Sequence, residues 1–342
     1  MVSVLHILLG NHESGNSGSS KEQCELLLSL SRQRVDLEME QKWTPIVGPL
    51  AQNIARFISK GLLEEASLQD KLDAKYRVAD LKQMLEKKGV SCKGKKYEMI
   101  EAFVTFTPVD EAASLVADVR LYRATPAGQH RIDTHLAGKE KARLEMETEA
   151  LQSLWRGDTR KAWARIAKYQ ADQILPDPKW SRPIPQPLMN EAGYLLSFAY
   201  NDLPLNEAQR KMVGAHLALS IMLGESFAES GRRLIKYTEG QFDWAQATAF
   251  HRPSPCGKDD ACDVATLAEM YATTRIQEAL ASCELEGLMS DRLGKGIKIL
   301  PVYGVDCSIC HSGKYTYEWS EIDKLPKLPR QMGCQCTYAA WL

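Results

Sequence analysis

The stretch VADLKQMLEKKGVSCKGKKYEMIEAF, residues 78–103, carries the clearest helical pattern in the chain. Its first half ends at Gly89, as glycine often follows the last residue of a helix. A short loop over residues 90–94 leads to a second helix that starts at Lys95. The apolar residues at helical spacing are Val78, Leu81, Leu85, Met99, Ile100 and Phe103. Two short helices with such faces can bury one small core, so the stretch predicts a compact helical hairpin.

The same part of the chain concentrates positive charge. Residues 75–96 hold eight basic and two acidic residues, a net charge of +6, within a chain of formal net charge −1. Backbone amides at the start of the second helix, together with nearby lysines, offer a site for a phosphate group. The lysines that we expect to contact DNA phosphates are Lys82, Lys87, Lys88, Lys93, Lys95 and Lys96.

In its order and spacing, this stretch resembles the SAP motif, the helix–extended–helix module of chromatin and DNA-repair proteins. The matching features are Leu81, Leu85, Gly89, Gly94, Lys95, Met99 and Ile100. The resemblance covers about 28 residues and implies binding to duplex DNA, mostly through the backbone. Little sequence specificity is expected, because the stretch has no obvious set of base-reading side chains. The alternative is a solvated, lysine-rich hairpin that only packs on its neighbours.

The whole chain has the composition of an ordinary globular protein. Of its 342 residues, 44% are hydrophobic and 25% are charged, and a chain of this length usually forms two or three domains. The near-balance of charge excludes a uniformly basic nucleic-acid coat as a description of the whole chain. No run approaches about 18 consecutive apolar residues, and residues 1–10 lack the basic start of a secretory signal. We therefore expect a cytoplasmic protein with no membrane partner.

The periodicity along the chain predicts a mainly α-helical, multidomain fold. The expected parts are a flexible N-terminus (1–20), a helical N-terminal region (21–70), a SAP-like domain (71–107), a helical region (108–175), a proline-rich connector (176–187), a helical domain (188–296) and a small α+β zinc module (297–342). The connector holds five prolines in twelve residues, and no helix tolerates proline at that density.

Local signals predict where several helices begin and end. Asn206 is suited to cap a helix, because its side chain accepts hydrogen bonds from backbone amides of the first turn. Residues 126–128, which contain a proline and a glycine, are expected to break a helix. A long helix is expected over residues 263–292 and is expected to end at Gly294 and Gly296.

Four of the nine cysteines lie within the last 36 residues. They form two close pairs, Cys307-Ser-Ile-Cys310 and Cys334-Gln-Cys336, with 23 residues between the pairs. Two such pairs can present four thiolates to one tetrahedral ion, and zinc commonly takes structural sites of this kind. We therefore predict a structural Zn²⁺ bound by Cys307, Cys310, Cys334 and Cys336.

Other interpretations of the cysteines stay open. The terminal four are also compatible with a redox-active pair, an iron–sulfur cluster or unmetallated thiols, although no βαβ unit that would suit a redox pair is evident. His311 is a weaker alternative ligand. Cys256 and Cys262, near His251, are compatible with a second site, although loop cysteines without a function are the simpler interpretation.

The order of features around these cysteines is similar to the C-terminal domain of phage head-morphogenesis proteins, the Mu F-like minor head family. The matching features are a helix with Thr274-Arg275, the first cysteine pair, a strand after Gly313-Lys314, a proline-rich turn over 325–329 and the final cysteine pair. The resemblance covers about 70 residues. It implies a zinc-binding module in a protein that joins portal or capsid proteins during head assembly.

No sequence motif for catalysis is evident, because HExxH, GxSxG and GxGxxG are all absent. An enzyme is therefore the less favoured class. The sequence favours a DNA-associated protein that binds the duplex through its SAP-like unit and carries a C-terminal structural zinc module. Two alternatives remain: a phage-derived minor head protein that acts in capsid assembly, and a DNA-processing enzyme such as a nuclease.

Overall fold

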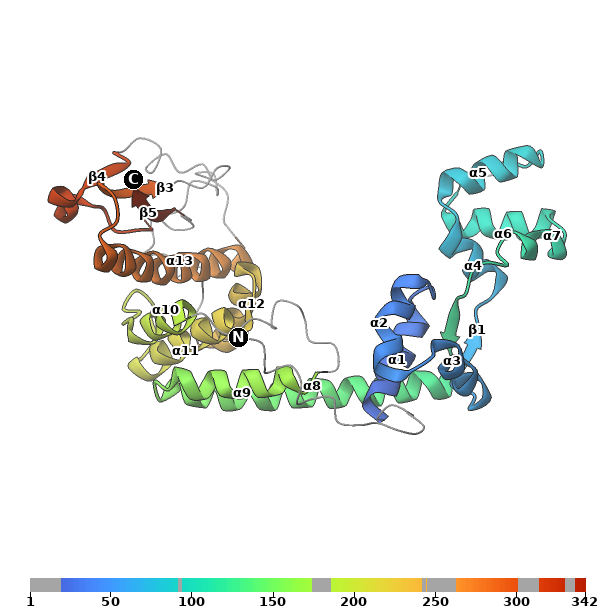
Figure 1. The fold of residues 1–342 in the computed structure, drawn as a ribbon, viewed down its shortest axis with the longest axis horizontal. Helices are drawn as coiled ribbons and strands as arrows, with labels where there is room; N and C mark the ends of the chain where they lie inside the picture. The colour runs from blue at the N-terminus through green and yellow to red at the C-terminus, as the bar shows by residue number, and fades with distance from the viewer. Residues whose placement is uncertain are drawn as a thin grey trace, which may run out of the picture. The chain divides into compact units, whose positions relative to one another are not determined.

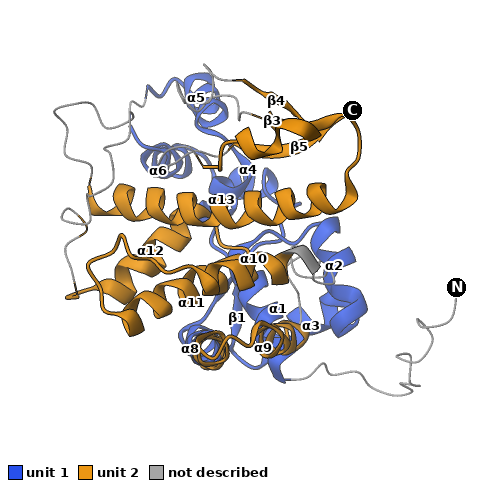
Figure 2. Ribbon diagram, turned by 90° about the vertical axis from the view of Figure 1, so that its left-hand side faces the viewer, with its two compact units in different colours: residues 1–141 blue, residues 142–342 orange. Residues whose placement is uncertain are grey.

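A computed structural model of the chain describes residues 20–91, 94–173, 186–241, 244, 263–300, 314–329 and 336–342. These residues are mainly helical and include a small antiparallel sheet near the C-terminus, which confirms the predicted fold class at this level. The chain divides into two compact units, unit 1 over residues 1–141 and unit 2 over residues 142–342 (Figure 2). The division falls within the long helix α8 (Pro126–Trp155), where the sequence analysis places no boundary.

Unit 1 contains two groups of helices joined by a short antiparallel ribbon (Figure 1). The first group comprises α1 (Ser20–Arg32), α2 (Leu37–Val47), α3 (Leu50–Ser59) and the start of α8. The ribbon pairs β1 (Leu63–Glu65) with β2 (Tyr122–Ala124), so that Leu63 lies opposite Ala124. The second group, between the two strands, comprises α4 (Leu68–Lys75), α5 (Val78–Lys87), α6 (Lys96–Phe106) and α7 (Val109–Ser114).

The second group has its own hydrophobic core, and we call residues 66–121 the inserted module. The buried members of this core are Ala66, Leu72, Leu81, Leu85, Met99, Ile100, Phe103, Ala112, Val116, Val119 and Leu121. At the base of the module, the backbone N–H of Ala66 donates to the carbonyl of Leu121 at 3.0 Å. The predicted hairpin over residues 78–103 is therefore the centre of a larger module, in which α4 and α7 complete the core.

Unit 2 is built around the long helix α13 (Val264–Asp291). Its other helices are the end of α8, α9 (Thr159–Ala171), α10 (Gln186–Ser197), α11 (Glu207–Leu223) and α12 (Phe227–Thr238). Figure 1 shows α13 between these helices and a small sheet. One side of α13 contributes Tyr271 and Ala272 to the large helical core, while Ala281 belongs to the smaller core under the sheet.

The sheet in unit 2 has three antiparallel strands in the order β4-β3-β5. They are β3 (Gly296–Leu300), β4 (Thr316–Glu318) and β5 (Thr337–Trp341), and a short 3-10 helix, η2 (Trp319–Lys324), follows β4. Ile297 lies opposite Tyr317 of β4 and Ala340 of β5, which fixes the register of the sheet. Among the described strands β3 is central, so β4 and β5 are the two edges of this sheet.

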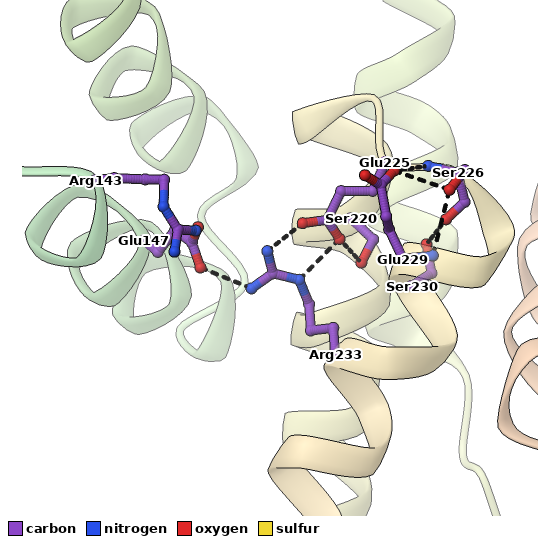
Figure 3. Close-up of polar contacts among 8 residues, drawn as sticks. All are labelled: Arg143, Glu147, Ser220, Glu225, Ser226, Glu229, Ser230 and Arg233. Atoms are coloured by element: carbon purple, nitrogen blue, oxygen red, sulfur yellow. Dashed lines mark hydrogen bonds and ion pairs between the residues drawn. The ribbon is translucent and has the colours of Figure 1, made fainter. Parts of the chain in front are cut away.

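An ion-pair network ties three helices of unit 2 together (Figure 3). The guanidinium of Arg233 on α12 donates to Glu225 at 2.9 Å and to Glu147 of α8 at 2.8 Å. The hydroxyl of Ser220 on α11 also donates to Glu225, at 2.8 Å, and Arg143 pairs with Glu147. The side chains of Arg233 and Glu147 are only 13% and 11% exposed, so each charge depends on its partner.

Some of the predicted helix ends are confirmed. Asn206 caps α11, because its side chain accepts the backbone N–H of Gln209 at 2.9 Å. The predicted long helix over residues 263–292 is α13, which begins at Val264 and ends at Asp291. The predicted connector lies outside the described residues as far as residue 185, and α10 begins at Gln186.

Other predictions are wrong, and two of them misread glycines. Residues 126–128 do not break a helix, because they form the first turn of α8. A Cβ on Gly128 would lie 1.9 Å from the carbonyl oxygen of Leu62, so this glycine permits a close approach of two backbones. Gly296 does not end α13 but starts β3, where a Cβ would lie 2.0 Å from the carbonyl oxygen of Tyr317.

The prediction that Val78 lies in the core of the hairpin is also wrong. The predicted hairpin core includes it, but its side chain is 46% exposed in the first turn of α5. The core instead takes Leu72 from α4, a helix that the sequence analysis does not predict separately. Among the helices that the structure describes, none has both the length and the apolar character needed to cross a membrane.

Candidate functional site

The inserted module presents the candidate DNA-binding surface. Its α5 begins after Arg77, whose backbone N–H donates to the carboxylate of Asp80 at 2.9 Å. Its α6 begins after Lys95, whose backbone N–H donates to Glu98 at 2.7 Å. Leu81 and Leu85 are almost fully buried in the core of the module. These contacts determine which side chains of the two helices reach solvent.

Two of the predicted lysines are held by acids from neighbouring helices. The Nζ of Lys88 donates to both carboxylate oxygens of Glu111 on α7, at 2.8 and 3.0 Å. The Nζ of Lys96 lies 3.0 Å from the carboxylate of Asp73 on α4. A phosphate would have to compete with a carboxylate for either lysine, so these two are weaker candidates for DNA contact.

Other cations of the module remain available to a phosphate. Lys82 lies 4.0 Å from Glu86, and both side chains are 61% exposed, so solvent screens their attraction. Within the part of the chain that the structure describes, the exposed side chains of Lys87 and Lys95 have no ion-pair partner. The same holds for Arg77, which the sequence analysis does not single out. Lys93 lies outside the described residues.

The N-terminus of α6 differs from the expected phosphate site. One carboxylate oxygen of Glu98 accepts the backbone N–H of Lys95, and the other accepts the hydroxyl of Tyr97 at 3.0 Å. The hydrogen bond to Glu98 raises the pKa of Tyr97. The helix therefore supplies its own anion at this position, so the exposed side chains are the better candidates for a phosphate contact. Glu98, three residues after Lys95, was the sequence signal for this cap.

The charge of the complete module is close to neutral. Residues 66–121 contain ten basic and nine acidic residues, a net charge of +1. The excess over residues 75–96 is thus largely offset by acids on α4, α6 and α7. Any attraction of this module to a phosphate backbone would come from a few exposed cations rather than from a strongly basic surface.

The second candidate site is at the C-terminal sheet. Cys307, Cys310 and Cys334 lie outside the described residues, and Cys336 lies directly before β5. The side chain of Cys336 is 3% exposed and belongs to the small core that includes Ile299 and Tyr338. Within the described ranges alone, no three His, Cys, Asp or Glu side chains form a group that could hold a metal ion.

The strand pairing places the described residues that flank the first cysteine pair at the same end of the sheet as Cys336. Leu300, the last residue of β3, lies opposite Thr337, the first residue of β5. The N–H of Ile299 donates to the carbonyl of Tyr315, just before β4, at 2.8 Å. The segment that carries Cys307 and Cys310 therefore leaves and rejoins the sheet at the same end at which Cys336 enters it.

Arg275, which belongs to the phage-like pattern, contacts two acidic side chains and two aromatic rings. Its guanidinium pairs with Asp202 and, at 2.7 Å, with Glu278. It also lies 4.4 Å from the ring centroid of Phe198 and 5.2 Å from that of Tyr271. Arg275 therefore fastens the segment between α10 and α11 to α13.

No protein-family model, no curated protein and no solved structure matches this chain. The function of this chain is therefore inferred from its own residues.

Proposed function

We propose that this protein associates with duplex DNA through the inserted module and that its C-terminal sheet carries a structural zinc ion. The observation that supports DNA binding best is a set of exposed cationic side chains on a module that has its own core. Within the described part of the chain, none of these side chains is hydrogen-bonded to an acid. These cations are Arg77, Lys82, Lys87 and Lys95. Contacts from such side chains to phosphates position a protein on DNA and carry no sequence information directly.

The small number of cations has a consequence for the mode of binding. Each phosphate neutralised by a lysine or arginine releases counterions, so binding weakens as salt rises. With few contacts and a module close to neutral, we expect weak, sequence-independent binding. The inserted module then serves to hold the chain on DNA.

We expect the double variant Lys87→Ala/Lys95→Ala to bind duplex DNA more weakly, and equally so for unrelated sequences. Two lost phosphate contacts should lower the magnitude of the log–log salt slope by about two. The matched control is Lys88→Ala/Lys96→Ala, which removes the same charge from lysines already held by Glu111 and Asp73. Fluorescence anisotropy across a salt series measures both. Equal losses in the two variants would mean that only net charge matters, and the assigned surface would be wrong.

The zinc part of the proposal concerns stability. Cys307, Cys310, Cys334 and Cys336 would hold the ion, and the ion would fasten the two long connections of the sheet at one end. The described strands are short, at five, three and five residues. A sheet of this size buries little apolar surface, so a metal would add much of its stability.

A second candidate function is assembly of a phage-type head. The observation that favours it is the order of the described elements after α13, which runs strand, strand, short 3-10 helix, proline-containing turn and terminal strand. This order agrees with what the resemblance to the Mu F-like minor head family implies. Genes for portal and capsid proteins beside the gene for this chain would favour assembly, and their absence would favour the DNA-associated role.

A further inference from the structure

The start of β5 is attached to α13 by one side chain. The carboxylate of Glu284 accepts the hydroxyl of Thr337 and, at 3.3 Å, the backbone N–H of Tyr338. Both contacts are made by the same oxygen, Oε2. Thr337 and Tyr338 directly follow Cys336, so Glu284 holds the backbone next to that cysteine.

The direction of the strand explains why this contact is needed. Ile299 lies opposite Tyr338, and the N–H of Ile299 points away from β5 and donates to the carbonyl of Tyr315, just before β4. In an antiparallel ladder, this makes Ile299 and Tyr338 a pair that exchanges no hydrogen bond, so the N–H of Tyr338 points away from β3. An edge amide of this kind requires another acceptor. Glu284 supplies it from the helix below.

The two sides of β5 are therefore held by different parts of unit 2. Its inner side is fixed by pairing with β3, and its outer side is fixed by Glu284. Cys336 directly precedes the residues that pair with β3 and contact Glu284. Its side chain is almost fully buried. A thiolate ligand must meet a zinc ion at about 2.3 Å, so the backbone that carries it has to be held in place.

We propose that Glu284 is a positioning residue for the zinc site, which fixes Cys336 through the backbone at the start of β5. This inference depends on the proposed zinc site. Groups outside the direct ligands commonly alter metal affinity by about 10–100-fold when they are removed. Glu284 acts from α13 and would also couple the metal to the helical core.

The test compares zinc affinity in the full chain and in Glu284→Ala, by competition with a chromogenic chelator. We expect the affinity to fall by about 10–100-fold. Glu286→Ala is the control, because Glu286 is an exposed acid on the same helix, and among the described contacts none joins it to β5. Glu284→Gln, which keeps an acceptor oxygen, should restore most of the affinity and serves if Glu284→Ala folds poorly.

Cobalt substitution reports on the thiolate ligands themselves. With four thiolates bound, Co²⁺ shows a tetrahedral spectrum, and a loosened Cys336 in Glu284→Ala should weaken its thiolate charge-transfer band. Similar affinities and spectra for Glu284→Ala and Glu286→Ala would overturn the inference while leaving the zinc site in place. A wild-type chain without stoichiometric zinc would refute the zinc proposal itself, and the role of Glu284 with it.

Discussion

Replacing Arg233 with alanine is expected to lower the free energy of unfolding of unit 2 by about 3–5 kcal/mol. The variant would leave the carboxylates of Glu147 and Glu225, which are 11% and 19% exposed, without the guanidinium that faces both (Figure 3). Glu147 would keep Arg143 and Glu225 would keep the hydroxyl of Ser220, but each buried carboxylate would keep its desolvation cost and lose the attraction of Arg233 that offsets it. Chemical denaturation followed by circular dichroism measures the change.

The neighbouring Arg232 provides the control for this prediction. Its side chain is exposed, so Arg232→Ala removes the same charge from the same helix and should change stability by less than about 0.5 kcal/mol. An effect of Arg233→Ala as small as that of Arg232→Ala would show that the network contributes little.

The effect of Arg233→Ala should also depend on pH. Burial raises the pKa of Glu225, but hydrogen bonds and charge from Arg233 outweigh it and hold the pKa below its ordinary value of 4.5. A carboxyl with a lowered pKa stabilises the folded state above pH 4.5, and this contribution is lost as the pH falls through the folded value. The difference between wild type and variant should therefore shrink in acid.

Replacing Cys336 with serine is expected to abolish stoichiometric zinc binding and local order together. Serine cannot supply a soft thiolate, and a structural zinc site needs all four of its ligands. Amide hydrogen exchange should quicken over β3 and β5, while the helical core around Tyr271 keeps its protection. Metal analysis and exchange mass spectrometry provide the two measurements.

Cys283 supplies the matched control for this replacement. It lies half-buried on α13, and burial, with the nearby acids Glu191 and Glu286, raises the pKa of its thiol to about 11. A thiol that stays protonated at neutral pH is a poor metal ligand. Cys283→Ser should thus keep both zinc and exchange protection. Retention of zinc by Cys336→Ser would contradict the assigned ligand set.

Local signals in the sequence were sufficient for the centre of the inserted module. Leu81, Leu85 and Ile100 repeat at helical spacing, and all three are buried as expected. The full extent of the module could not be predicted, since β1 and β2 have only three residues each and show no alternation long enough to detect. The roles of the glycines could not be predicted either, because they depend on contacts with residues far away in the sequence. Gly128 permits a contact with Leu62, which is remote in the sequence, and a local pattern cannot reveal it.

On the candidate DNA surface, the sequence likewise does not show which lysines are paired with distant acids. Lys87 and Lys88 are neighbours in the sequence and look equivalent there. In the folded module, Lys88 meets Glu111, which is 23 residues away, while Lys87 stays exposed. Charge counting therefore located the module but could not tell available lysines from paired ones. The contact between Glu284 and the start of β5 likewise joins residues more than 50 positions apart.

The most direct test of the account is the salt dependence of duplex binding by the wild-type chain. Four available cations, Arg77, Lys82, Lys87 and Lys95, predict a log–log slope of about −3 to −4, the same for unrelated duplexes. Binding isotherms from low to moderate salt provide this slope. No binding at low salt, or binding that is indifferent to salt, would contradict the proposal that the inserted module holds this protein on the DNA backbone.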